Sequence, residues 1–131
     1  MTKRPYLSTI LWALLILILC GIPGRDIPHI SFLELLSFDK FVHAGIFFVL
    51  VILFIRSNRS QKGEYVRKHA AFLAVGISIP YGGLLEIMQG TFFIERSADI
   101  FDFIANSTGC IMAALLYKFI SLKLPKLKLP L

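Results

Sequence analysis

Residues 86–109, EIMQGTFFIERSADIFDFIANSTG, place charged and amide side chains within an otherwise apolar sequence. If the second half of this segment is helical, Asp99, Asp102, Asn106 and Gly109 recur at spacings of three, four and three and share one face. The other positions of that helix are mostly Ile, Phe, Ala and Leu. Acids and an amide that face lipid are costly, so we expect the polar face to meet protein or a water-filled cavity. An ionisable group within a membrane is a candidate functional site, and the fold is expected to be arranged around it.

The composition indicates a small integral membrane protein of one domain, residues 1–131. The chain is 56% hydrophobic and 17% charged, and its mean hydropathy is +0.75. A chain of this composition is too apolar for an ordinary soluble domain. The sequence shows no internal repeat, no glycine-rich phosphate loop and no nucleophile elbow, which leaves the polar segment as the main candidate for function.

Four segments are apolar enough to cross a bilayer, which takes about 20 residues. They are residues 6–23, 41–55, 70–89 and 100–120, and we predict an all-α membrane protein with four transmembrane helices. The second segment is short, so we place Asp39 and Lys40 at the interface and His43 about one turn below the surface. Asp39 and His43 share a face at i, i+4, whereas Lys40 is expected to point elsewhere around the helix. Pro80 is expected to kink the third helix.

The segment between the first two spans allows more than one structure. GIPG at residues 21–24 ends the first helix, and residues 27–36 then alternate apolar and polar side chains without the length to cross a bilayer. Two interpretations remain open for residues 27–36, a short interfacial helix or a loop.

The charges predict how the helices are oriented. The net charge is +6, and eleven of the fourteen Lys and Arg residues lie before the first span, between the second and third, or after the fourth. Seven of the eight acids lie in or beside the other two connections. By the positive-inside rule, both termini and residues 56–68 are cytoplasmic, and the polar cluster lies at the outer face of a bacterial cytoplasmic membrane. Topology therefore accounts for the positive charge without nucleic acid, and we expect the basic loop and the tail 121–131 to contact anionic lipid.

Nine polar residues map to the outer third of the last three spans. They are Asp39, Lys40, His43, Glu86, Gln89, Arg96, Asp99, Asp102 and Asn106. Helices that only need to pack can use Gly, Ala, Ser and Thr, whereas each charge at a helix centre costs about 2.5 to 3.5 kcal/mol. Each residue has a structural interpretation, such as Asp39 capping its helix or His43 as a hydrogen-bonded core residue. Their number favours a functional pocket over a purely structural salt-bridge cluster.

The order and spacing of these residues resemble a known family. Asp39-Lys40-x-x-His43-x-x-x-Phe47, then Glu86-x-x-Gln89, then Arg96-x-x-Asp99-x-x-Asp102-x-x-x-Asn106-x-x-Gly109 resembles the VanZ-like family of small bacterial membrane proteins, over about residues 38–116. The resemblance implies a link with low-level resistance to the glycopeptide antibiotic teicoplanin. It also implies a remoter relation to membrane enzymes that exchange or hydrolyse lipid head groups, including phosphatidylserine synthases.

A pocket of carboxylates, one histidine and two cations at the outer leaflet suits a phosphate-bearing lipid or a lipid-linked envelope precursor. The candidate catalytic residues are His43, Asp39, Asp99 and Asp102, and the candidate substrate-binding residues are Lys40, Glu86, Gln89, Arg96 and Asn106. His43, oriented by Asp39, would act as general base or nucleophile. Lys40 and Arg96 would hold the phosphate. A divalent cation, magnesium, calcium or manganese, would be bound by Glu86, Asp99 and Asp102.

Two other classes of function remain open. A non-catalytic protein that binds or shields a lipid head group or an antibiotic needs the charges but no base, so His43→Gln would preserve its phenotype. A scaffold would lose stability with each substitution, and no ligand would restore it. Transport is disfavoured because the polar groups at one face give no path through the membrane. Small residues such as Gly76 and Ala113 suit either packing within the bundle or a homo-oligomer.

Overall fold

The chain folds as a bundle of helices. A computed structural model describes residues 4–22, 32–92 and 98–123, and all the regular structure in these ranges is helical. The elements are α1 (Leu7–Cys20), α2 (Phe32–Arg59), α3 (Glu64–Lys68), α4 (Ala70–Thr91) and α5 (Ile100–Lys123). The predicted all-α class is confirmed for the part of the chain that the structure describes.

Three helices are long and apolar enough to cross a membrane. These segments are Asp39–Arg59 of α2, Ala70–Thr91 of α4 and Ile100–Phe119 of α5, which correspond to the second, third and fourth predicted spans. The first predicted span, residues 6–23, forms the shorter apolar helix α1 of 14 residues. A straight crossing takes about 20 residues, so four full spans and their orientation stay predictions.

The connections differ from the sequence prediction in two places. α2 begins at Phe32, well before the expected start at residue 41, so residues 32–36 are the first turns of a 28-residue helix. Residues 32–36 are therefore helical, which contradicts the loop, but they form part of α2 and not a separate helix. Residues 27–31 lie outside the described residues, and an interfacial position for this segment stays a prediction. The basic hairpin at residues 56–68 contains the short helix α3. α4 continues through Pro80, and the kink expected there stays a prediction.

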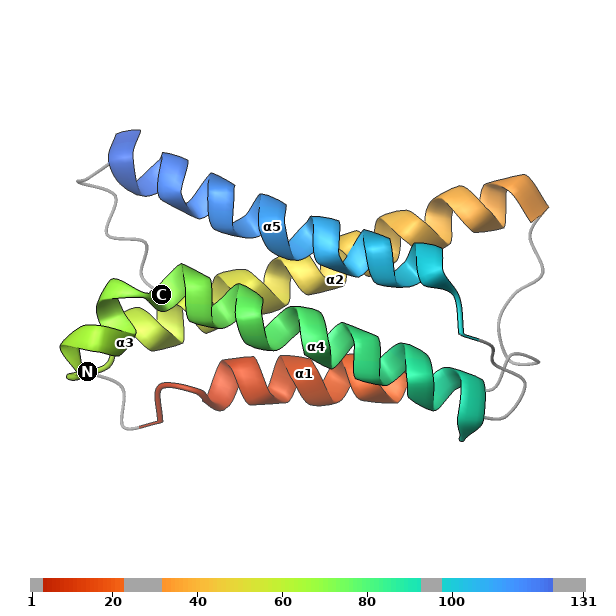
Figure 1. Cartoon of the computed structure of the whole chain (residues 1–131), viewed down its shortest axis with the longest axis horizontal. Helices are drawn as coiled ribbons and strands as arrows, with labels where there is room; N and C mark the ends of the chain where they lie inside the picture. Colours follow the sequence, from red (N-terminus) through yellow and green to blue (C-terminus); the bar gives the residue numbers. More distant parts are fainter. Residues whose placement is uncertain (1–3, 23–31, 93–97, 124–131) are drawn as a thin grey trace.

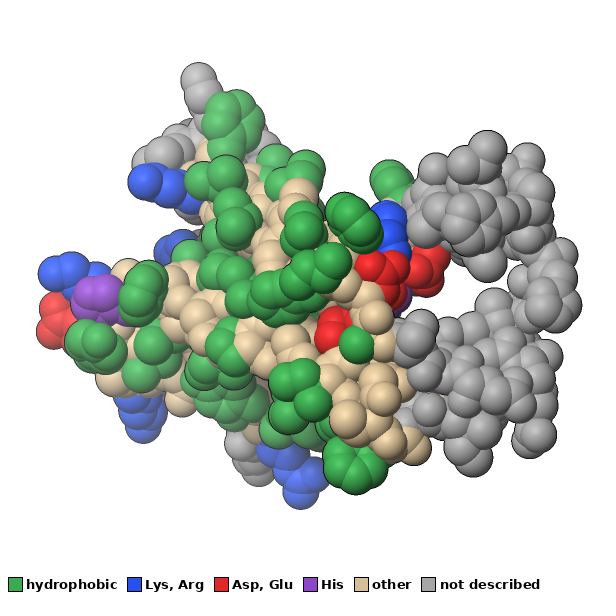
Figure 2. Space-filling view, turned by 45° about the vertical axis from the view of Figure 1, so that its right-hand side comes forward, with side chains coloured by type: hydrophobic (Ala, Val, Ile, Leu, Met, Phe, Trp, Pro, Cys, Tyr) green, Lys and Arg blue, Asp and Glu red, His purple; other side chains and the backbone are tan. Residues whose placement is uncertain are grey.

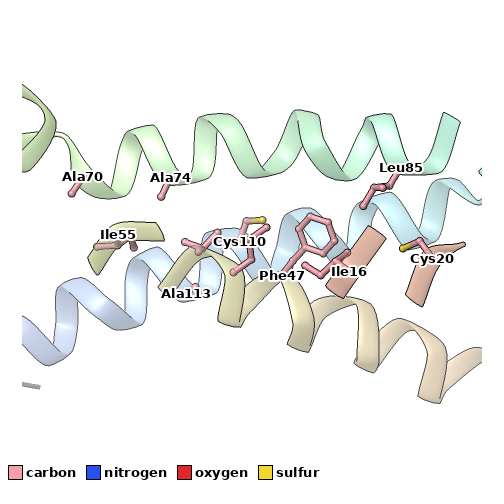
Figure 3. Packing of buried hydrophobic residues seen from close by; sticks show 11 residues of the cluster. Ile16, Cys20, Phe47, Ile55, Ala70, Ala74, Leu85, Cys110 and Ala113 are labelled. Carbon is pink, nitrogen blue, oxygen red and sulfur yellow. The ribbon is translucent and has the colours of Figure 1, made fainter. Parts of the chain in front are cut away.

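The two long middle helices separate the first helix from the last. α5 packs against α2 and α4, and α1 packs against the same two helices, without contact between α1 and α5 in the described ranges (Figure 1). α3 lies at one end of the bundle, and the start of α5 and the end of α4 lie at the other. Side chains from α1, α2, α4 and α5 meet in the centre (Figure 3), where Ile16, Phe47 and Cys110 are fully buried.

One glycine allows α2 and α5 to touch through their backbones. A Cβ atom added at Gly109 would lie 2.1 Å from the carbonyl oxygen of Ala44 and 3.0 Å from its Cα. Only glycine permits this approach, which small residues at helix crossings make possible in membranes. His43 precedes Ala44, and Asn106 lies one turn before Gly109, so the same contact brings the polar faces of the two helices together.

A second polar network, which the sequence pattern did not predict, lies at the α3 end. The Tyr6 hydroxyl donates to Asn58 Oδ1 at 2.9 Å, and Asn58 Nδ2 donates to the carbonyl oxygen of Ala70 at 3.0 Å. The hydroxyls of Thr9 and Ser57 are 2.9 Å apart and share a hydrogen bond. These contacts join α1, α2 and α4 with satisfied polar groups, as a buried position requires.

Candidate functional site

The start of α2, the end of α4 and the start of α5 bring most of the predicted polar residues together. Acidic side chains gather at this end of the molecule beside a basic one, whereas the opposite end is mainly basic (Figure 2). Contacts between side chains join six of the predicted residues, and Glu86 is joined to them through the backbone of Asp99. The six are Asp39, Lys40, His43, Asp99, Asp102 and Asn106. Arg96, predicted to hold phosphate, lies outside the described residues.

Lys40 joins α2 to the start of α5. Its Nζ donates to Asp99 Oδ2 at 2.6 Å and also to Asp102 Oδ1, and it lies 3.6 Å from Asp39 Oδ2. The expectation that Lys40 points away from Asp39 is therefore wrong. Neighbouring Cβ atoms on a helix do diverge, but the four-carbon stem of lysine lets its ammonium group swing back to the acids. In this position Lys40 neutralises carboxylates, so its charge is already engaged.

His43 is held in one orientation by Asn106. The His43 side chain is 7% exposed, and its Nδ1 lies 3.0 Å from Asn106 Oδ1. An amide oxygen can only accept, so Nδ1 carries the proton and donates it to this bond. Nε2 then lies 3.4 Å from Asp39 Oδ1 and 3.6 Å from Asp102 Oδ2. A bare lone pair that faces two carboxylates is unfavourable, so this space suits a proton or a metal cation.

Glu86 and Asp99 fix the start of α5. The backbone N–H of Asp99 donates to Glu86 Oε2 at 3.0 Å, and Asp99 Oδ1 accepts from the N–H of Phe101 at 2.8 Å. A carboxylate at this position caps a helix and is stabilised by the positive end of the helix dipole. The ammonium group of Lys40, which donates to Asp99, holds the pKa of that carboxyl below its usual range. Both acids are thus engaged in holding α4 and α2 against α5.

Gln89 lies apart from the acids. It is 2% exposed, and its Nε2 donates to the carbonyl oxygen of Cys20 at the end of α1, at 3.2 Å. Its Oε1 has no hydrogen-bond partner among the described residues. Gln89 therefore ties α4 to α1, and its predicted role in binding substrate stays a prediction.

The best-placed metal ligands are Asp39, His43 and Asp102. Each offers one ligand atom, and the three atoms lie within 4.8 Å of one another. This set shares only Asp102 with the predicted set of Glu86, Asp99 and Asp102, because helix capping and Lys40 engage the other two acids. Two carboxylates and an imidazole suit a divalent cation, and manganese accepts both kinds of ligand.

The described part of the site is acidic as a whole. Four carboxylates, those of Asp39, Glu86, Asp99 and Asp102, lie around one lysine and one histidine. Asp39 is the most open of the four carboxylates, with 41% of its side chain exposed, whereas the side chain of Asp102 is 11% exposed. A ligand that reaches the cluster from outside therefore meets Asp39 first, and an anionic ligand meets net negative charge.

Comparisons with known proteins agree with the sequence resemblance and extend it to α1. The VanZ/LLP1 family model matches residues 6–121, which include most of every helix. An uncharacterized protein of the fission yeast Schizosaccharomyces pombe is 32% identical over 78 residues, which are 60% of this chain and 45% of that protein. The chain thus spans less than half the length of this relative. No solved structure matches the chain. The helices, the polar motifs and the family match together assign this chain to the VanZ/LLP1 family.

Proposed function

We propose that this protein is a membrane-embedded enzyme that hydrolyses or transfers the phosphate-bearing head group of a lipid or of a lipid-linked envelope precursor. The observation that carries the proposal is the buried His43, whose Nδ1 is held by Asn106 and whose Nε2 faces Asp39 and Asp102. Orienting one nitrogen of an imidazole through the other is how catalytic and metal-binding histidines are held. Nε2 is then left facing Asp39 and Asp102, where it can take either a proton or a metal cation, and the manganese titration below separates the two.

The acidic character of the site implies a divalent cation. A phosphate group would be repelled by the carboxylates, and the Lys40 ammonium group is already shared by Asp99 and Asp102. Asp39, His43 and Asp102 would hold the cation, with Asn106 orienting His43. A bound magnesium or manganese ion would offset charge on the phosphoryl oxygens and lower the pKa of a bound water. In this arrangement His43 acts as a ligand, and Lys40 supports the site by fixing Asp102.

The distribution of Lys and Arg along the chain suggests which side of the membrane the polar cluster faces. The basic residues before α1, around α3 and at the end of the chain favour those segments at the cytoplasmic side. We therefore propose that the cluster opens to the outer face of a bacterial cytoplasmic membrane. An altered envelope precursor at that face would change susceptibility to a glycopeptide such as teicoplanin.

Lipid mass spectrometry on expressing cells tests the activity without assuming a substrate. Wild type, His43→Ala, Asp102→Ala and Thr91→Ala would be compared at matched membrane levels. Thr91 is a suitable control because it lies on α4 and its hydroxyl donates to the carbonyl oxygen of Ile87 within the same helix. We expect a lipid or lipid-linked species to change with wild type and Thr91→Ala alone. Identical lipid profiles for all four inserted proteins would overturn the enzymatic proposal and favour the binding role.

The cation is tested by titrating manganese into the purified protein and following its paramagnetic resonance signal. Asp39→Asn should weaken binding, whereas Glu86→Gln should leave it close to wild type, because Glu86 bonds to the backbone of Asp99. The opposite pattern would favour the ligand set predicted from sequence. Manganese binding that neither His43→Gln nor Asp39→Asn changes would rule out this site.

A further inference from the structure

A cavity lies in the opposite half of the bundle from the polar cluster. It has a volume of about 570 Å³, and its lining residues come from α1, α2, α3 and α4. Most of its wall is apolar, with Leu50, Phe54, Leu73 and Ile77 as its larger aliphatic and aromatic side chains. Two of the helices that line it, α2 and α4, contain segments long and apolar enough to cross a membrane, so a bilayer around them would place lipid at the mouth of the cavity.

The cavity is separate from the candidate active site. Tyr81 lines its inner end and donates from its hydroxyl to the carbonyl oxygen of Ala13 at 2.6 Å. Phe47 is fully buried, and its ring centroid lies 6.2 Å from that of Tyr81. Phe47 is one helical turn from His43 on α2, so its ring stands between the cavity and the polar cluster. A molecule that fills the cavity would therefore be different from the ligand of the polar cluster.

Three basic residues lie close in sequence to residues that line the α3 end of the cavity. Tyr6 and Val66 line the cavity near α3. Arg4 lies close to Tyr6 in sequence, and Arg67 and Lys68 follow Val66; all three are exposed. The polar atoms at this end are already paired, since the Tyr6 hydroxyl donates to Asn58. This arrangement offers positive charge outside the cavity and hydrocarbon inside it.

We propose that the cavity holds one hydrocarbon chain of an anionic membrane phospholipid whose head group lies beside Arg4, Arg67 and Lys68. Along α2, the distance from Asn58 at the α3 end of the cavity to Leu50 near its other end is about 12 Å, at 1.5 Å per residue. An extended chain can follow this path while the phosphate stays at the surface. The hydrocarbon chain would fill the space that α1 leaves against α2 and α4.

The Ser78 hydroxyl allows a test that distinguishes a hydrocarbon chain in the cavity from a ligand that binds through an oxygen atom. Ser78 is one of the residues that line the cavity and is 1% exposed, and its hydroxyl has no hydrogen-bond partner among the described residues. A hydrocarbon chain offers no acceptor at this depth, and a helical serine can instead turn its hydroxyl to the carbonyl oxygen one turn earlier, here Ala74. Removing the Ser78 hydroxyl should therefore not weaken the binding of a hydrocarbon chain, whereas it should weaken the binding of a ligand that accepts a hydrogen bond through an oxygen.

Native mass spectrometry of the full chain tests the proposal. The protein would be reconstituted with phosphatidylglycerol or phosphatidylcholine of identical chains and then extracted in detergent. Wild type should retain one phosphatidylglycerol and little phosphatidylcholine. Ala13→Phe narrows the cavity and should lose the lipid, whereas Leu14→Phe, at a neighbouring position that is 49% exposed and outside the lining, should retain it.

Two further variants leave the packing of the cavity nearly intact. Replacing Arg67 and Lys68 together by Gln should lower phosphatidylglycerol retention about 30-fold, because each basic residue near a membrane surface contributes a factor of about five. Ser78→Ala should retain the lipid. Equal retention of both lipids, or retention that the double Gln variant leaves unchanged, would contradict the proposal that the bound lipid is anionic. Loss of the lipid in Ser78→Ala would contradict the proposal that a hydrocarbon chain fills the cavity.

Discussion

Replacing Gly109 by Ala should separate α2 from α5 and damage the polar cluster at the same time. The added methyl group would lie 2.1 Å from the carbonyl oxygen of Ala44, whereas real Cβ atoms essentially never come closer than 3.0 Å to another atom. The obstacle is backbone, so no side chain can rotate away. The two helices must move apart at the position where His43 meets Asn106.

The expected cost is large for a single methyl group. Overpacking a well-packed site costs about 1 to 3 kcal/mol, and a backbone obstacle places this substitution at the upper end or above it. The intrinsic preference of a helix for Ala over Gly returns only about 0.5 to 1 kcal/mol. The net loss should therefore be about 2 kcal/mol or more of unfolding free energy.

Gly45→Ala is the matched control. Gly45 lies on α2 beside Ala44, is exposed, and has no atom within 4 Å of an added Cβ. The same substitution there should keep or raise stability by about 0.5 to 1 kcal/mol through helix propensity. Thermal unfolding in detergent would measure both variants, and manganese titration would show whether the cluster is intact. Gly109→Ala should lose cation binding, and Gly45→Ala should keep it.

The reasoning would be refuted if the two alanine variants unfolded at the same temperature, because helix propensity would then be the only effect. If Gly109→Ala unfolded early but bound manganese normally, the helix contact would be real and its control of the His43 geometry would be wrong.

Other substitutions test single contacts. Lys40→Met should lower unfolding free energy by up to about 3 kcal/mol, since it leaves Asp99 and Asp102 without their shared cation, and adding Asp102→Asn should recover part of this in a double-mutant cycle. Tyr81→Phe removes the hydrogen bond to the carbonyl oxygen of Ala13 and should cost about 1 kcal/mol, with faster hydrogen exchange in α1 as the readout. The pKa of Asp99 is lowered by Lys40, so its contribution to stability should be complete above about pH 4. That contribution should be lost as pH falls through the lowered pKa, and an acid titration of unfolding temperature on wild type and Asp99→Asn would show the difference.

Much of the fold could be predicted from hydropathy and spacing. Apolar runs of sufficient length gave the positions of α2, α4 and α5, because a bilayer span needs a minimum number of apolar residues whatever its neighbours are. The period of a helix placed Asp39 near His43, and Asp102 on the same face as Asn106. The family motifs rest on the same residues, so the order and spacing of those residues along the chain suffice to recognise membership.

The interactions within the site could not be read in the same way. Sequence separation says nothing about which acid a flexible lysine will reach, and Lys40 binds Asp99 and Asp102, about sixty residues away. Asp99 looked like a metal ligand because it shares a face with Asp102, but its position at the start of α5 makes it a cap. Gln89 shares a face with Glu86 in sequence, yet its amide bonds to α1.

The apolar segments and the helix faces on which the polar residues lie could thus be predicted, because they depend on local periodicity and on transfer to lipid. The early start of α2 and the short helix α3 were not predicted. The partners of the polar residues depend on tertiary packing. The backbone contact at Gly109 sets the distance between α2 and α5, and that distance gives His43 its orientation and selects Asp39, His43 and Asp102 as a group. The cavity beside α1 was likewise not visible in the sequence, because an empty space between helices depends on how the surfaces of four helices fit together.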